Sequence, residues 1–299
     1  MPSLTSAYII VPYKTLRMQK LFNKILVPVD FSARSRQAIE KACDIAKQYQ
    51  CSIHVLHVVP ISPFAAIAMT EGPMAIPYSF IENKKGIEAE LKKLVSKITM
   101  LTDNSVKADY HILQGTWDEA IIDYATSYNF DLVLVGQKEN LLNKRKMFIN
   151  PDKIAAKADI PVITVPSNRR LTRLFTILIP ITEFLPVRKL MYGIYIASGY
   201  NTTLKLLGVE NEKTREKVRY YLNKAYQLIK DNSGIRVELE TVQSNNVAEA
   251  VNQFAKLKSA DLVIVNPQTQ TKMPGFFSSF FGNILQKYSS PPILTINPV

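Results

Sequence analysis

The sequence is poor in cysteine, histidine and tryptophan, and the scarcity of cysteine argues against a protein held together by disulfides. Its 299 residues include two cysteines, three histidines and one tryptophan. The two thiols, Cys43 and Cys51, have no metal-ligand pattern around them, and they fit a reducing cytoplasm better than a disulfide framework. No apolar run reaches the roughly 18 residues that a membrane-spanning helix needs. We therefore expect a cytoplasmic protein without a membrane partner.

The first residues lack the order of features that an export signal has. A short apolar stretch at residues 8–13 precedes Lys14 and Arg17, whereas a signal peptide carries its charges first and a longer apolar stretch after them. We interpret residues 1–21 as an N-terminal extension, with Met18 as the physiological start.

Positive charge is abundant, but no nucleic acid motif accompanies it. The net charge is +12, and basic residues gather near the N-terminus, at residues 138–146 and at residues 169–173. Such clusters attract phosphates and nucleic acids. Because no helix-turn-helix, zinc finger or aromatic RNA-binding motif is present, the charge alone does not predict a nucleic acid partner.

Three segments of the first half recur in the same order in the second half. KILVPVD at residues 24–30 corresponds to TILIPIT at 176–182, DLVLVG at 131–136 to DLVIVN at 261–266, and IPVITVP at 160–166 to PPILTIN at 291–297. An internal repeat of this kind predicts two copies of one structural unit. We therefore predict two domains, at residues 22–167 and 168–299.

Within each copy, apolar runs alternate with helical patterns. In the first copy we expect strands at residues 25–29, 52–59, 106–113, 132–135 and 162–165, with helices after the N-caps Ser32 and Thr116 and at residues 80–101 and 151–158. Strands separated by helices predict parallel neighbours and right-handed crossovers. The fold class is therefore α/β, with two tandem Rossmann-like domains that are each a five-stranded, parallel, doubly wound sheet.

A ligand of such a sheet binds beyond the carboxyl ends of the strands, where the strand order reverses. In the first copy, Asp30 and Gly136 end the two strands at this point. The following helix begins with Asn150 and Pro151, which suit the N-cap and the first helical position. A helix N-terminus at the crevice attracts phosphate.

Together, the strand spacing, Asp30 and the repeated Asp-Leu-Val-x-Val segment resemble the universal stress protein family, whose fold is like that of the adenine nucleotide alpha hydrolases. In that family the first strand ends in an Asp that contacts the adenine and ribose side. The fourth strand leads into Gly-x2-Gly-x9-Gly-Ser/Thr/Asn, which wraps ATP phosphates in nucleotide-binding members. Over about residues 22–299, the resemblance implies a candidate site at Asp30, Gly136 and Asn150. Lys138, in the basic loop, is an added cation for phosphate.

Both copies depart from the family pattern. In the first copy, Glu139 and Ile149 stand where the second and third glycines are expected. Glycine allows backbone N–H groups to approach a phosphate, whereas a Glu carboxylate repels it. In the second copy, Thr182, Asn266 and Thr269 replace the Asp and the first two glycines. The aromatic cluster at residues 274–281 there predicts an interface or a core plug.

These departures favour a non-enzymatic stress-response protein with a regulatory role and no firm cofactor. The alternative is an ATP- or AMP-binding protein that uses the first domain, with slow hydrolysis. No Ser-His-Asp or Cys-His motif predicts a hydrolase. His54 and His57 are three apart on a predicted strand and face opposite sides, so we expect no shared metal.

The resemblance also implies how the copies associate. Tandem members of the family commonly pair their domains through the fifth strands. Residues 162–165 and 293–296 are therefore the expected edges of contact, either within one chain or in a homodimer.

Overall fold

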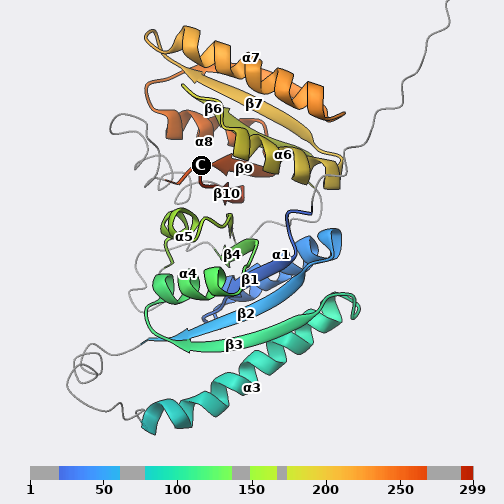
Figure 1. Cartoon of the computed structure of the whole chain (residues 1–299), viewed down its shortest axis with the longest axis vertical. Helices are drawn as coiled ribbons and strands as arrows, with labels where there is room; N and C mark the ends of the chain where they lie inside the picture. Colours follow the sequence, from blue (N-terminus) through green and yellow to red (C-terminus); the bar gives the residue numbers. More distant parts are fainter. Residues whose placement is uncertain (1–19, 61–77, 137–148, 167–173, 268–290, 299) are drawn as a thin grey trace, which may run out of the picture.

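The computed structural model describes residues 20–60, 78–136, 149–166, 174–267 and 291–298 (Figure 1). The predicted N-terminal start at Met18, the basic loop with Lys138, the junction between the copies and the aromatic cluster at 274–281 lie outside these residues.

The first domain alternates strands and helices in the predicted order. Its elements are β1 (Lys24–Pro28), α1 (Ala33–Tyr49), β2 (Ser52–Val59), α3 (Tyr78–Leu101), β3 (Ala108–Gln114), α4 (Trp117–Ser127), β4 (Leu132–Gly136), α5 (Pro151–Ala158) and β5 (Val162–Val165). The predicted bounds of β2, α5 and β5 are confirmed. The third strand begins later than predicted, because its pairing with β2 starts at Ala108 opposite Ile53.

The second domain repeats the same order with shorter connections. Its elements are β6 (Thr176–Ile181), α6 (Val187–Tyr200), β7 (Thr203–Glu210), α7 (Arg215–Asn232), β8 (Val237–Gln243), α8 (Val247–Leu257), β9 (Leu262–Val265) and β10 (Ile293–Thr295). The predicted repeat is therefore confirmed as two copies of one fold.

All ten strands form one continuous sheet, in the order β3-β2-β1-β4-β5-β10-β9-β6-β7-β8. Strands are parallel within each domain, whereas β5 and β10 are antiparallel, with Ile163 opposite Leu294. The predicted contact through the fifth strands is thus present within one chain. The strands of the first domain are therefore antiparallel to those of the second domain at β5 and β10.

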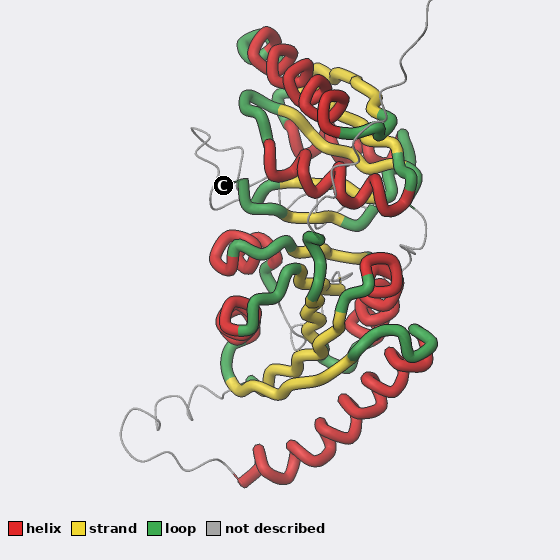
Figure 2. Tube along the Cα trace, turned by 45° about the vertical axis from the view of Figure 1, so that its right-hand side comes forward, coloured by secondary structure: helices red, strands yellow, loops and turns green. Residues whose placement is uncertain are grey.

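Helices cover both faces of this sheet (Figure 2). One face packs α1, α3, α6 and α7 in a single apolar core that extends across both domains. The opposite face is divided, with α4 and α5 on the first domain and α8 on the second. The shared core on one face makes the two domains one packed body.

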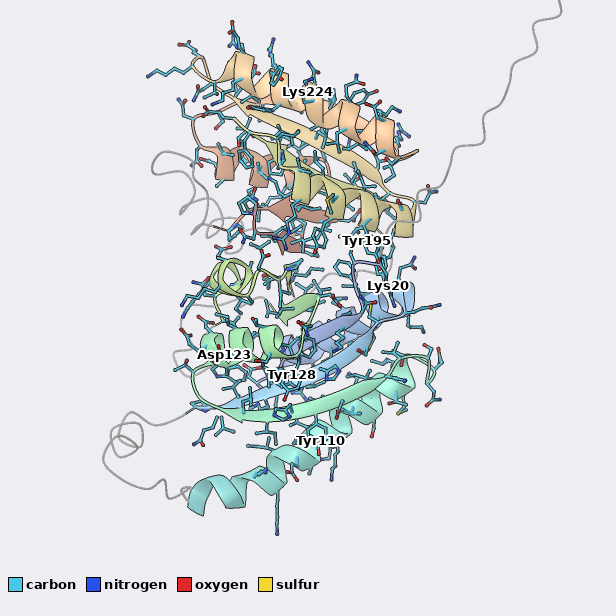
Figure 3. The ribbon with its side chains drawn as sticks, in the orientation of Figure 1. Lys20, Tyr110, Asp123, Tyr128, Tyr195 and Lys224 are labelled. Carbon is cyan, nitrogen blue, oxygen red and sulfur yellow. The ribbon has the colours of Figure 1, made fainter. Side chains whose placement is uncertain are left out.

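Aromatic side chains line the seam between the domains. The Tyr49 ring at the end of α1 stacks on Tyr195 of α6 with centroids 5.0 Å apart, and its hydroxyl donates to the Ile196 carbonyl at 3.3 Å. Phe22 lies edge-on to both rings. In Figure 3, Tyr195 lies where the domains meet, whereas Lys224 lies on α7, far from the first domain.

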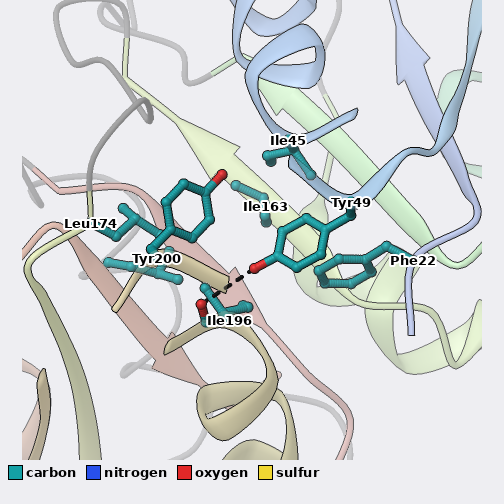
Figure 4. Close-up of a pocket in the computed structure, with 8 residues that line it drawn as sticks. Phe22, Ile45, Tyr49, Ile163, Leu174, Ile196 and Tyr200 are labelled. Carbon is teal, nitrogen blue, oxygen red and sulfur yellow. Dashed lines mark hydrogen bonds between the residues drawn. The ribbon is translucent and has the colours of Figure 1, made fainter. Parts of the chain in front are cut away.

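A small apolar cavity of about 20 Å³ lies within this seam (Figure 4). Its lining includes Phe22, Tyr49 and Ile163 from the first domain and Leu174, Ile196 and Tyr200 from the second. This volume is close to that of one water molecule.

Candidate functional site

The register of the sheet locates the crevice of the first domain. β1 pairs with β2 as far as Pro28, but it pairs with β4 only at Ile25 and Leu26. β1 and β4 therefore separate toward their carboxyl ends, which is the place where doubly wound sheets bind ligands. Gly136 is the last residue of β4, as predicted, and Asp30 lies just beyond the end of β1.

Asp30 is bonded to residues of its own loop and helix. One carboxylate oxygen accepts from the Ser32 backbone N–H at 3.1 Å and from the Ser32 hydroxyl, and the other pairs with the Arg34 guanidinium at 2.9 Å. Burial of this carboxyl acts to raise its pKa, but the hydrogen bonds from Ser32 and Arg34 outweigh it and lower the pKa. Asp30 is therefore ionised, and its charge is already compensated.

Ser32 continues this arrangement into α1. Its hydroxyl oxygen accepts from the Ser35 N–H at 3.3 Å, which makes it the predicted N-cap. Asp30, Ser32 and Arg34 thus form one hydrogen-bonded group at the start of the helix.

Gly136 has a packing reason to be glycine. A Cβ built at this position would lie 2.6 Å from the Arg34 carbonyl oxygen and 2.8 Å from its carbonyl carbon. These separations are well inside van der Waals contact, so β4 approaches the first turn of α1 too closely for any side chain. The packing of α1 on β4 therefore explains this glycine without a ligand.

Asn150 forms the predicted N-cap of α5, with its side-chain oxygen accepting from the Lys153 N–H at 3.1 Å. Its own backbone N–H donates to the Asp118 carboxylate at 3.0 Å. Burial is the main influence that raises the pKa of Asp118, against the hydrogen bond from Asn150 and the charge of Lys153. A carboxylate of the chain thus lies at the helix start where a phosphate was predicted.

The two acids in the first turn of α4 also contact α5. Thr116 is at the N-cap position, but its side chain makes no capping bond. Asp118 and Glu119 connect α4 to α5, since Lys153 lies 3.7 Å from the first carboxylate and 2.9 Å from the second.

A row of three aromatic rings begins at Phe31, the residue after Asp30. The Phe31 and His57 rings are 4.7 Å apart, and the His57 ring meets Trp117 edge to face at 5.7 Å. His57 Nδ1 donates to the Val29 carbonyl at 2.8 Å, and burial lowers the pKa of His57, so the ring is neutral at pH 7. Phe31 has a φ of 58°, a left-handed conformation that is uncommon for a bulky residue.

The corresponding crevice of the second domain has different chemistry. Thr182 follows β6 where Asp30 follows β1, and Asn266 follows β9 where Gly136 ends β4. The Asn266 amide donates to the Ile296 carbonyl at 3.1 Å, which ties β9 to the end of β10. Lys189, in the first turn of α6, is buried here.

Sequence reasoning missed Arg34, the contact of Asp118 with α5, and Lys189. The i, i+4 spacing of Asp30 and Arg34 was the available signal for their ion pair, since residues at this spacing are helix neighbours. A lysine in an otherwise apolar helical stretch was the signal for Lys189. No feature of the sequence indicated that Asp118 of α4 contacts the start of α5.

Metal binding and membrane insertion have no support in the described part of the chain. The described residues contain no cluster of three or more potential metal ligands. His54 contacts Phe130, whereas His57 contacts Phe31, so the two histidines have different neighbours. None of the described helices combines the length and apolarity that a membrane crossing requires.

Comparison with known proteins identifies the family. Residues 21–166 match the Universal stress protein family. The first half of the chain belongs to this family. Stress response protein NhaX of Bacillus subtilis is 27% identical over 161 residues, which are 48% of this chain and 97% of that protein. Universal stress protein MJ0531 of Methanocaldococcus jannaschii is 27% identical over 153 residues, covering 51% of this chain and 86% of that protein.

Solved structures extend the likeness to both halves. A universal stress protein from Archaeoglobus fulgidus superimposes with a TM-score of 0.70 at 16% identity, covering 94% of this chain and 100% of that chain. A putative universal stress protein from Pseudomonas aeruginosa gives a TM-score of 0.59 at 16% identity, covering 92% of this chain and 93% of that chain. At such identities, the likeness establishes the tandem fold and carries no information about ligands.

Proposed function

We propose that this universal stress protein is a non-enzymatic protein with a regulatory role in stress response, and that its first-domain crevice does not hold a nucleotide. The family membership gives the stress-response class. The absence of enzymatic activity and of nucleotide binding are our proposals, and they rest on the chemistry of the crevice.

One observation carries the proposal: the polar groups that a nucleotide would need are bonded to one another. Both carboxylate oxygens of Asp30 have partners in Ser32 and Arg34. The Asn150 N–H has a partner in Asp118. A nucleotide would have to break these bonds, and the Asp118 carboxylate would repel its phosphates.

The aromatic rings support the same conclusion on the side where the family Asp contacts the base. The His57 ring contacts both Phe31 and Trp117 there. A base would have to separate these rings before it could stack on them. Glu139 and Ile149, in place of two glycines, add to this argument from the sequence.

Calorimetry of the full chain with ATP and magnesium, and separately with AMP, tests the proposal. We expect no saturable heat at micromolar nucleotide and no release of phosphate from ATP. Asp118→Asn tests the repulsion of phosphate by this carboxylate, because it removes the negative charge beside Asn150 and keeps the shape of the side chain. Micromolar binding by the wild type that disappears in Asp30→Ala would reject the proposal and favour the ATP- or AMP-binding alternative.

The location and the further partners are also proposals. Cys43 and Cys51 are both buried free thiols, and burial raises their pKa values to about 12 and about 11. Such unreactive thiols are compatible with the cytoplasm that we propose. The fifth strands are already paired within the chain, so a homodimer would need another surface; light scattering of the purified protein tests for one.

A further inference from the structure

Lys189 is buried, and the described residues place no counter-ion beside it. Only 4% of its surface is exposed, and its ammonium donates one hydrogen bond, to the Pro180 carbonyl at 3.1 Å. The Phe184 ring lies 6.0 Å from the same nitrogen. No carboxylate in the described part of the chain forms an ion pair with it.

The charged groups around α6 are paired elsewhere. Neither β6 nor β9 carries an ionisable side chain. Lys205 and Glu210 of β7 are bonded to Glu238 and to Arg219 of α7, respectively. Glu183, which precedes α6, lies 3.5 Å from Lys217 of α7, with both side chains exposed.

The start of α6 adds to the unfavourable environment of a charge at Lys189. Its first turn contains no acidic residue, and its N-cap is Pro186, which makes no side-chain capping bond. The N-terminus of a helix is the positive end of its dipole, so a cation there is destabilised. A buried amine in this place is therefore neutral, and burial lowers the pKa of Lys189 to about 7.

The preceding residue in the chain, Arg188, joins the two domains. Arg188 donates to the Asp159 backbone carbonyl at 3.0 Å and pairs with the Asp159 carboxylate at the end of α5. The Asn297 side chain after β10 donates to the same carboxylate at 2.9 Å. Because Arg188 and Lys189 share one turn, α6 cannot expose the amine to water without disturbing this contact.

We propose that Lys189 makes the docking of the first turn of α6 sensitive to pH, and with it the Arg188–Asp159 contact between the domains. An open first turn hydrates the amine, which then has the ordinary lysine pKa of about 10.5. Between about pH 7 and 10.5 the docked state is neutral and the open state is charged, so falling pH favours opening. Below about pH 7 both states are charged, and the equilibrium no longer changes.

Hydrogen exchange of α6 amides in the full chain, measured by mass spectrometry between about pH 7 and pH 9.5, tests the proposal. After correction for intrinsic exchange rates, we expect the open fraction to fall as pH rises, by up to about tenfold per pH unit. Lys189→Met and Lys189→Gln are expected to abolish this dependence. Lys205→Met is the matched control, because Lys205 is paired with Glu238, and its loss should leave the pH dependence of α6 unchanged.

Two results would overturn the proposal. One is a wild-type open fraction that does not change with pH after the correction. The other is the same slope in the wild type and in both Lys189 variants, which would assign the pH dependence to another group.

Discussion

The crevices of the two domains lie at the same point of the same fold, but they treat charge in opposite ways. In the first domain, the half-buried charge of Asp30 has the cation Arg34 as its partner, 2.9 Å away. In the second domain, Thr182 and Pro186 occupy these two positions. The buried group there is an amine, Lys189, and no anion among the described residues pairs with it. The fold therefore tolerates a balanced ion pair or a neutral amine at this point, and the packed sheet around it is the same.

The largest expected effect comes from removing the unbalanced group in the second domain. Lys189→Met should stabilise the protein against urea by about 3 kcal/mol at pH 7, because the unfolded lysine is charged and the folded one is held near neutrality. The sign follows from the lowered pKa: wild-type stability rises with pH from about 7 to 10.5, and the variant loses this rise. Equal urea midpoints for the wild type and Lys189→Met at pH 7 would contradict the expected stabilisation.

A smaller loss is expected when the close approach in the first domain is blocked. Gly136→Ala should destabilise the protein by about 2 kcal/mol, because the new Cβ meets the backbone of Arg34, which cannot move without α1. Asn266→Ala is the counterpart in the second domain and should cost about 1 kcal/mol for its one hydrogen bond to Ile296. Urea unfolding monitored by circular dichroism measures both, and a neutral Gly136→Ala would show that α1 is free to shift.

A similar or smaller loss of stability is expected when a side chain is added at the seam between the domains. A Cβ at Gly199 would lie 2.6 Å from the Tyr49 hydroxyl oxygen, whose ring stacks on Tyr195. Gly199→Ala should cost about 1–2 kcal/mol, since the ring has to tilt away from its partner. Gly234→Ala is the control, because no atom lies within 4 Å of its Cβ, and it should be close to neutral. Thermal unfolding of both variants checks the prediction, which fails if they unfold at the same temperature.

The smallest expected effect compares two helix starts within the first domain. Ser32→Ala removes a capping bond and a partner of Asp30, and it should cost about 1 kcal/mol. Thr116 makes no capping bond, so Thr116→Ala should cost less than about 0.5 kcal/mol. Similar losses in urea unfolding would show that Thr116 caps α4 in solution.

The elements of the fold were predictable because their signals are local. The continuous apolar run that begins at Ile25 predicted a buried strand, and the capping signals at Ser32 and Asn150 predicted the starts of α1 and α5. The internal repeat predicted the second copy from the first. Boundaries differed by one or two residues at β3 and β10, where pairing with a neighbouring strand decides the first or last residue.

The candidate site was predictable only as a position. Asp30, Gly136 and Asn150 do follow strands or begin a helix at the crevice, as expected from the order of elements. Their partners were not predictable, because Asp118 is far from Asn150 in the sequence and reaches it only when α4 packs beside α5. Lys138 lies outside the described residues, so its proposed contact with phosphate stays a prediction.

The sequence by itself determined the repeated α/β unit, the parallel strand order within it and the place of its crevice. Periodicity, capping residues and the repeat act over short distances along the chain, so they can be read without coordinates. Only the tertiary structure decided that the ten strands form one sheet, that Asp118 lies at the start of α5 and that Lys189 is buried beside the Pro180 carbonyl. Each of these depends on which distant groups meet after folding, and the cost of a buried charge is set by such neighbours.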